Sequence, residues 1–115
     1  MSAVAGVDPV GALAVDVPLE PVPTEQVLDG DPYAGTVVLG EFDGDEFGVW
    51  EMTPGAMTDV ESAELFVVLA GAASVEFLDD EVVVQLVPGS VMMLDAGVRT
   101  IWTVTQTLRK LWVAG

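Results

Sequence analysis

The sequence predicts an all-β domain, and three observations support this prediction. Short apolar runs rich in Val, Phe and Trp recur along the chain from Gly35 onward. Turn-forming residues separate these runs, as at Asp43-Gly44-Asp45, Pro54-Gly55 and Pro88-Gly89. Apart from a short turn near Thr24, no segment of ten or more residues combines a helical period with caps. A chain of 115 residues with this pattern fits one β-sandwich or β-barrel domain.

Eight candidate strands can be assigned in chain order. The acidic pair Asp79-Asp80 separates the fourth run from the fifth and predicts a tight hairpin turn. Gly71 and Gly97 are interpreted as breaks between strands. The predicted strands are Thr36 to Leu39, Phe47 to Met52, Leu65 to Ala70, Ser74 to Leu78, Val82 to Val87, Ser90 to Leu94, Thr100 to Val104 and Leu108 to Val113.

The segment before the first predicted strand is rich in proline. Proline occupies positions 9, 18, 21, 23 and 32, which suits extended backbone rather than helix. We therefore expect residues 1–30 to form an N-terminal arm or edge strand, and residues 31–115 to form the barrel.

The composition excludes several classes of partner. Nineteen acidic and three basic residues give a net charge of -16, which repels phosphate backbones and anionic membrane surfaces. Glu, Asp, Gln, Gly or Pro interrupts every apolar run well short of the roughly 20 residues of a spanning helix. We thus expect no nucleic acid and no membrane partner.

Two further expectations follow from the composition. The segment before Asp16 lacks the basic residues that a secretory signal would have, so we expect a cytoplasmic protein. The 51% hydrophobic fraction predicts a barrel partly buried in a homodimer.

The chain contains no Cys and no His. A disulfide framework, a thiolate zinc site and a Cys nucleophile are therefore excluded. The commonest metal ligand and general base among protein side chains is absent as well.

Several residues of the chain form a recognisable set, namely Gly48 to Gly55, Glu64 followed by Gly71, Pro88-Gly89, Asp95-Ala96-Gly97 and Trp102. Together they resemble the small single-domain cupins related to the ethanolamine-utilisation and ureidoglycine aminohydrolase cupins. The resemblance implies a double-stranded β-helix, the cupin or jelly-roll barrel, with a ligand pocket at its mouth.

The metal-binding histidines of these cupins are missing. Counting back from Glu64, the histidine pair of the first motif falls on Thr58 and Val60, or on Met57 and Asp59 in a looser spacing. The histidine of the second motif falls on Thr100. These residue types make a poor site for Fe, Mn, Ni or Zn, so we expect no metal and no other cofactor.

Glu64 is the candidate catalytic residue. Strand alternation places it on one face with Phe66 and Val68, and burial on such a face allows a carboxylate to act as a general acid or base. A glutamate at a strand end in water is the alternative. Lys110, on the last predicted strand, would need burial to act as a nucleophile.

Five further residues are candidates for binding a ligand. Trp50 and Met52 share one strand face, Trp102 alternates with Thr100, and Tyr33 stands at the end of the arm, where it could close over the barrel mouth. Ordinary packing is the alternative for each of them.

Three functions remain open on the sequence alone. The first is a metal-free cupin that binds a small neutral or apolar molecule in its barrel. The second is a cofactor-independent isomerase, cyclase or amidohydrolase that uses Glu64 as acid or base. The third is a dimeric structural or regulatory module with a packed barrel.

Overall fold

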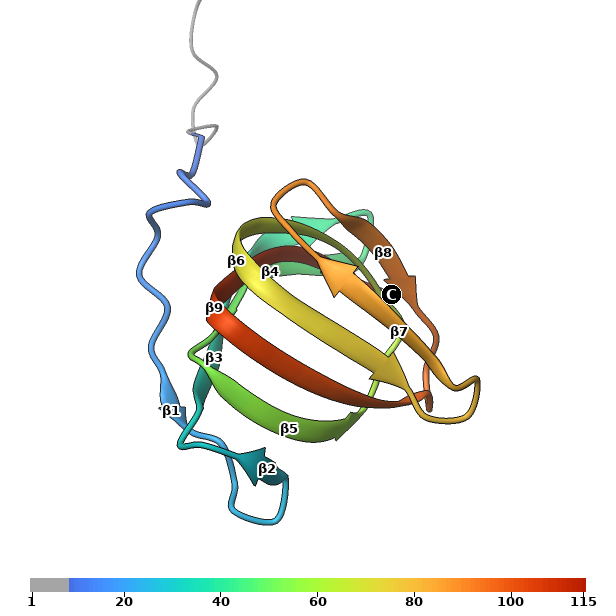
Figure 1. Ribbon diagram of the computed structural model, residues 1–115. Coiled ribbons are helices and arrows are strands. Elements are labelled where there is room, and N and C mark those ends of the chain that lie inside the picture. Colours follow the sequence, from blue (N-terminus) through green and yellow to red (C-terminus); the bar gives the residue numbers. More distant parts are fainter. Residues whose placement is uncertain (1–8) are drawn as a thin grey trace, which may run out of the picture.

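The computed structural model describes residues 9–115, which curl into a β-barrel with the N-terminal segment extended along its outside (Figure 1). The described residues contain no helix that is long and apolar enough to cross a membrane. Their strands are β1 (Glu20–Pro21), β2 (Val27–Asp29), β3 (Tyr33–Phe42), β4 (Asp45–Met52), β5 (Gly55–Val60), β6 (Glu64–Phe77), β7 (Val82–Leu86), β8 (Val91–Leu94) and β9 (Arg99–Ala114).

Two long strands, β6 and β9, organise the barrel, and every strand pair is antiparallel. β9 pairs with β6 over nearly its whole length; β4 and β5 pair with different halves of β9 and so share its other edge. β6 in turn pairs with β7 and β8 on its remaining edge. On one side, β4 pairs with β3, which pairs with β1; on the other side, β5 pairs with β2.

The all-β prediction is confirmed, but several strand boundaries are wrong. The runs Leu65 to Ala70 and Ser74 to Leu78 belong to the single strand β6 except for Leu78, which lies in the turn after it, and the last two predicted runs both belong to β9. The predicted break at Pro54-Gly55 is present, since Thr53 and Pro54 separate β4 from β5, but β5 itself, which begins at Gly55, is absent from the predicted strands. The turn near Thr24 is followed by β2 rather than by a helix. The predicted hairpin around Asp79-Asp80 is present, because Phe77 pairs with Val82.

A β-bulge at Gly71 allows β6 to run on as one strand. Gly71 has a φ of 93°, and the pairing of β6 with β9 shifts register on both sides of it. Glu64, Phe66 and Val68 therefore face inward before the bulge, while the inward residues after it are odd-numbered, such as Val75. The bulge switches the inward face of β6 without interrupting β9.

The hydrophobic core lies inside the barrel. The even-numbered residues of β9 from Thr100 to Trp112 face it, because successive side chains of a strand point to opposite sides. Gln106 is the exception: it is exposed, at the point where the register with β6 shifts. The buried hydrophobic cluster comprises Val22, Met52, Met57, Phe66, Val68, Ala73, Val75, Leu86, Leu94, Trp102, Val104, Leu108 and Trp112.

The N-terminal arm is attached to the outside of the barrel at two levels. β1 pairs with β3 and β2 pairs with β5. Further toward the N-terminus, Arg109 donates hydrogen bonds from its Nη1 to the carbonyl oxygens of Ala12 (3.0 Å) and Val15 (2.8 Å), and from its Nε to Glu51 (2.9 Å). Residues 1–8 of the predicted arm lie outside the described residues.

Replacing Gly71 tests the role of the bulge. A Cβ at this position would lie 2.1 Å from the carbonyl oxygen of Thr107, whereas a Cβ at Gly89, with nearly the same φ of 92°, would meet nothing within 4 Å. We expect Gly89→Ala to lower the free energy of unfolding by roughly 1–2 kcal/mol, the cost of left-handed backbone. Gly71→Ala should cost about 1–3 kcal/mol more, because backbone must move to relieve the clash.

Chemical denaturation of the two variants provides the measurement. Equal losses of stability would show that backbone conformation alone, and not the close approach of β6 to β9, requires glycine at position 71.

Candidate functional site

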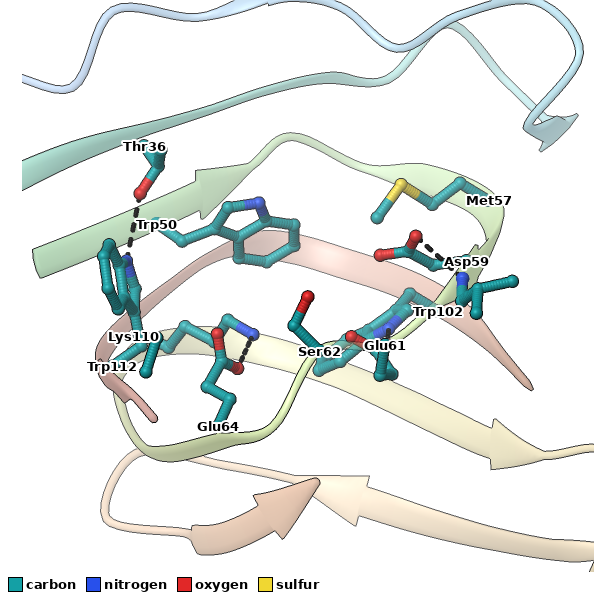
Figure 2. A pocket seen from close by; sticks show the side chains of 12 residues that line it. Thr36, Trp50, Met57, Asp59, Glu61, Ser62, Glu64, Trp102, Lys110 and Trp112 are labelled. Carbon is teal, nitrogen blue, oxygen red and sulfur yellow. Dashed lines mark hydrogen bonds and ion pairs between the residues drawn. The ribbon is translucent and has the colours of Figure 1, made fainter. Parts of the chain in front are cut away.

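A cavity of about 370 Å³ opens between the inner faces of the barrel strands and the loop that joins β5 to β6 (Figure 2). Its walls include all three tryptophans of the chain, which are Trp50, Trp102 and Trp112. The remaining lining includes three carboxylates and the lysine Lys110. Aromatic surface and ionisable groups are therefore concentrated in one small space.

Lys110 and Glu64 form a partly buried ion pair at this cavity. Lys110 faces inward from β9 and is 5% exposed, and its Nζ lies 2.6 Å from Oε2 of Glu64 on β6. Figure 2 shows the pair side by side at the cavity wall. The side chains are 6% and 18% exposed, so water screens this pair far less than a surface pair.

Aromatic rings surround the other sides of the Lys110 ammonium. Its Nζ lies 4.5 Å from the ring centroid of Phe66 and 4.8 Å from the centroids of Trp50 and Trp102. Trp50 and Lys110 are direct partners across β4 and β9, which accounts for the contact of the ammonium with Trp50. Ring faces attract cations, so the environment stabilises a positive charge at this point.

Glu61 holds a second polar network at the cavity. Its Oε2 accepts a hydrogen bond of 2.6 Å from the hydroxyl of Thr100 and one of 2.8 Å from the indole Nε1 of Trp102. Both donors face inward from β9. Glu61 follows β5 directly, so this network ties the loop between β5 and β6 to the barrel wall.

Asp59 is a third carboxylate at the cavity, on β5 opposite Thr100. Burial raises the pKa of Asp59 above its ordinary value, and the nearby negative charge of Glu61 raises it further. Its Oδ1 accepts a hydrogen bond of 2.9 Å from the backbone N–H of Val60, which acts in the opposite direction. Asp59 is thus a candidate group for exchanging protons with a bound molecule.

The structure brings together four of the six residues singled out from the sequence. Glu64, Trp50 and Trp102 line the cavity. Thr100 faces inward and is fully buried, but its hydroxyl donates to Glu61 rather than lining the open space.

Met52 and Tyr33 lie apart from this group. Met52 is fully buried in the hydrophobic core, two residues beyond Trp50 on the inner face of β4. Tyr33 begins β3 outside the barrel, is 45% exposed, and borders a separate hollow of about 480 Å³ with Pro32 and residues of the arm. Pairing of Tyr33 with Pro21 directs it toward the arm and not toward the mouth of the cavity.

Asp59 and Glu61 were not singled out as site residues from the sequence. The alternation Met57, Asp59, Glu61 indicates one strand face, but it becomes informative only if β5 is recognised as a strand. Met57 and Asp59 line the cavity, so the looser motif spacing matches the inward face of β5. Of the stricter spacing, Val60 also borders the cavity but is 65% exposed, and the Thr58 hydroxyl donates to the carbonyl of Thr100 (3.3 Å).

The donor set at these positions does not fit a transition-metal centre. Met57 and Thr100 stand where imidazoles would be needed, and the carboxylate of Glu64 is taken by Lys110. Among residues 9–115, no group of three or more His, Cys, Asp or Glu is arranged to hold a metal ion.

The sequence matches a family model over residues 39–112, and that model is described as the EutQ-like cupin domain. A search of curated proteins found no match.

Solved structures share the fold at low sequence identity. The EutQ protein of Clostridium difficile superposes with a TM-score of 0.72 at 17% identity, covering 97% of this chain and 89% of that one. A protein of unknown function from Acidithiobacillus ferrooxidans gives a TM-score of 0.61 at 21% identity, covering 91% and 98%. One from Pseudomonas syringae gives 0.77 at 19% identity, covering 92% of this chain but only 46% of its own length. These similarities establish the cupin barrel as the fold.

Replacing Asp59 tests the electrostatics of the cavity. Because the pKa of Asp59 is raised in the folded protein, the folded state binds more protons than the unfolded state as the pH rises above the ordinary value of 3.8. Its contribution to stability is therefore most favourable at low pH and is lost as the pH rises through the folded pKa. We expect the free energy of unfolding of Asp59→Asn to match that of the wild type near pH 3. As the pH rises above 3.8, the free energy of unfolding of the variant should exceed that of the wild type.

Urea denaturation across this pH range measures the difference, and Asp95→Asn, on an exposed turn, controls for the loss of one negative charge. A stability difference between Asp59→Asn and wild type that does not change with pH would contradict the assignment.

Proposed function

The chain belongs to the EutQ-like cupin domain family, and from this premise we propose that it binds a small organic molecule in its barrel without a metal ion. The observation that carries the proposal is a cavity of about 370 Å³ with aromatic walls and a buried ion pair. This volume lies at the lower end of the range for small-molecule sites. A barrel filled with side chains would leave no such space.

The lining favours an uncharged ligand with at least one hydrogen-bond acceptor. Asp59, Glu61 and Glu64 outnumber the single cation, Lys110, so an anion would meet net repulsion. The ring faces of Trp50 and Trp112 offer flat apolar surface for the rest of the molecule. The Lys110 ammonium has three N–H donors, and one of them is directed at Glu64.

Tryptophan emission gives a direct test, because all three tryptophans line the cavity. We expect at least one member of a panel of cyclohexanol, butyramide and γ-butyrolactone to change the emission saturably and to raise the melting temperature. Ser62→Leu, which adds bulk at the exposed rim, should weaken this binding by about tenfold or more, equivalent to ~1.4 kcal/mol.

Ala63→Leu is the matched control, since Ala63 is the exposed neighbour of Ser62 and does not line the cavity. The absence of any saturable change, or equal binding by both variants, would count against the cavity as a binding site.

We propose as a second function that the chain is a dimeric module that associates through the outer face of β8, β6 and β9. Met93, Leu65 and Val113 lie side by side across these strands and are 77%, 45% and 36% exposed. Val91, Val67 and Leu111 form the next row. A second copy is the favoured occupant, because these two rows carry no charged side chain in a chain of net charge -16, and two copies can meet there without bringing like charges together.

Placing a charge on this face tests the dimer. We expect Met93→Glu to shift sedimentation from dimer to monomer without loss of the fold, because the side chain is largely exposed in one chain. Leu28→Glu, at a 54% exposed position on β2 far along the sheet, should leave the dimer intact. A wild-type monomer at all concentrations tested would rule this interface out.

A further inference from the structure

Lys110 is the only lysine of the chain, and its position is unusual. The three basic residues of the sequence are Arg99, Arg109 and Lys110, so a protein of net charge -16 places its one primary amine side chain inside the barrel. Lysine is rarely buried to this extent, because desolvating its charge is costly. Both the cavity and the partner carboxylate are present at this residue, which points to a chemical role.

We propose that Lys110 forms an imine with a small aldehyde or ketone bound in the cavity, and that Glu64 carries the proton for this step. The inference deepens the proposed function and depends on it, since it names the class of ligand that the cavity admits. The juxtaposition that carries it is a cavity-lining amine, 5% exposed, with a carboxylate oxygen 2.6 Å from its nitrogen.

The reaction balances without any co-reactant. The Lys110 ammonium passes one proton to Glu64, and the lone pair on Nζ then attacks the carbonyl carbon. The C=O π electrons move to oxygen, which takes the proton back from Glu64 and becomes the hydroxyl of a carbinolamine. The carbinolamine nitrogen, which is cationic after the attack, then passes a second proton to Glu64, and Glu64 transfers it to the hydroxyl. The hydroxyl leaves as water, and the nitrogen lone pair freed by this deprotonation forms the C=N bond. An ammonium and an aldehyde thus become a protonated imine and one water, with no change in oxidation state.

The surroundings of Nζ suit this product as well as the starting amine. A protonated imine remains a cation at nearly the same place, so the ring faces of Trp50, Phe66 and Trp102 stay attractive throughout. Glu64 remains adjacent as counter-ion. Burial limits access of bulk water, which would otherwise hydrolyse the imine.

Reductive trapping compares two lysines in one molecule. The variant Gln85→Lys introduces an exposed amine on β7 while leaving the cavity unchanged. The protein is treated at pH 7 with propionaldehyde and sodium cyanoborohydride, and the modified positions are identified by peptide mass mapping after cleavage at acidic residues. We expect Lys110 to be alkylated about 100-fold faster than the introduced lysine, the lower range of a positioned acid–base group.

Two further substitutions, each combined with Gln85→Lys, identify the groups that take part in the reaction. Lys110→Arg retains a cation but cannot form an imine, so the internal adduct should disappear. Glu64→Gln should slow the labelling of Lys110 while leaving that of the introduced lysine unchanged. Tryptophan emission in the presence of whichever panel compound binds the wild type reports whether the cavity still forms.

The outcomes separate this inference from the proposed function. A Lys110 rate equal to or below that of the introduced lysine, with saturable binding of a panel compound retained, overturns the imine and leaves small-molecule binding in place. The same rate result together with no saturable binding of cyclohexanol, butyramide or γ-butyrolactone overturns both proposals. Rapid labelling that is unaffected by Glu64→Gln contradicts the role of Glu64.

Discussion

The pairing of β9 along both of its edges is the constraint on which this barrel depends. Antiparallel ladders fix which residues lie opposite each other, and alternation fixes which of them face inward. Trp50 on β4, Asp59 on β5 and Glu64 on β6 are all held by their register with β9. These three cavity residues are far apart in the sequence, and the same strand positions each of them.

A second constraint is electrostatic. A strongly acidic chain can cover its surface with carboxylates, but a carboxylate inside the barrel needs a partner because burial removes its hydration. Glu64 finds that partner in Lys110, and Glu61 finds neutral donors in Thr100 and Trp102. The two arrangements have different consequences. Hydrogen bonds from neutral groups fix Glu61 in place, whereas the proposed role of the ion pair is to let a proton pass between Lys110 and Glu64.

Local patterns predict the fold well and the site less well. Val-rich runs and the turn at Asp79-Asp80 are local signals, and they suffice for an all-β barrel. The predicted strand break at Gly71 is wrong, because glycine is found at β-bulges as well as at strand ends. Only the pairing of β6 with β9 distinguishes the two cases. Lys110 and Glu64 are 46 residues apart, so no sequence spacing reveals that they meet. Asp59 and Glu61 escape notice for a related reason, since they follow a Pro-Gly pair that usually ends a strand.

The place of β9 in the chain has a consequence for folding during synthesis. The ribosome makes this strand after β1 to β8, yet β4, β5 and β6 all depend on it for an edge partner. Until β9 emerges, the nascent chain can form hairpins such as β3 with β4 and β6 with β7, but the barrel cannot close. Open apolar edges are vulnerable to association with other chains during this interval. The abundance of negative charge on the earlier segments, with -16 overall, would keep neighbouring nascent chains apart until closure.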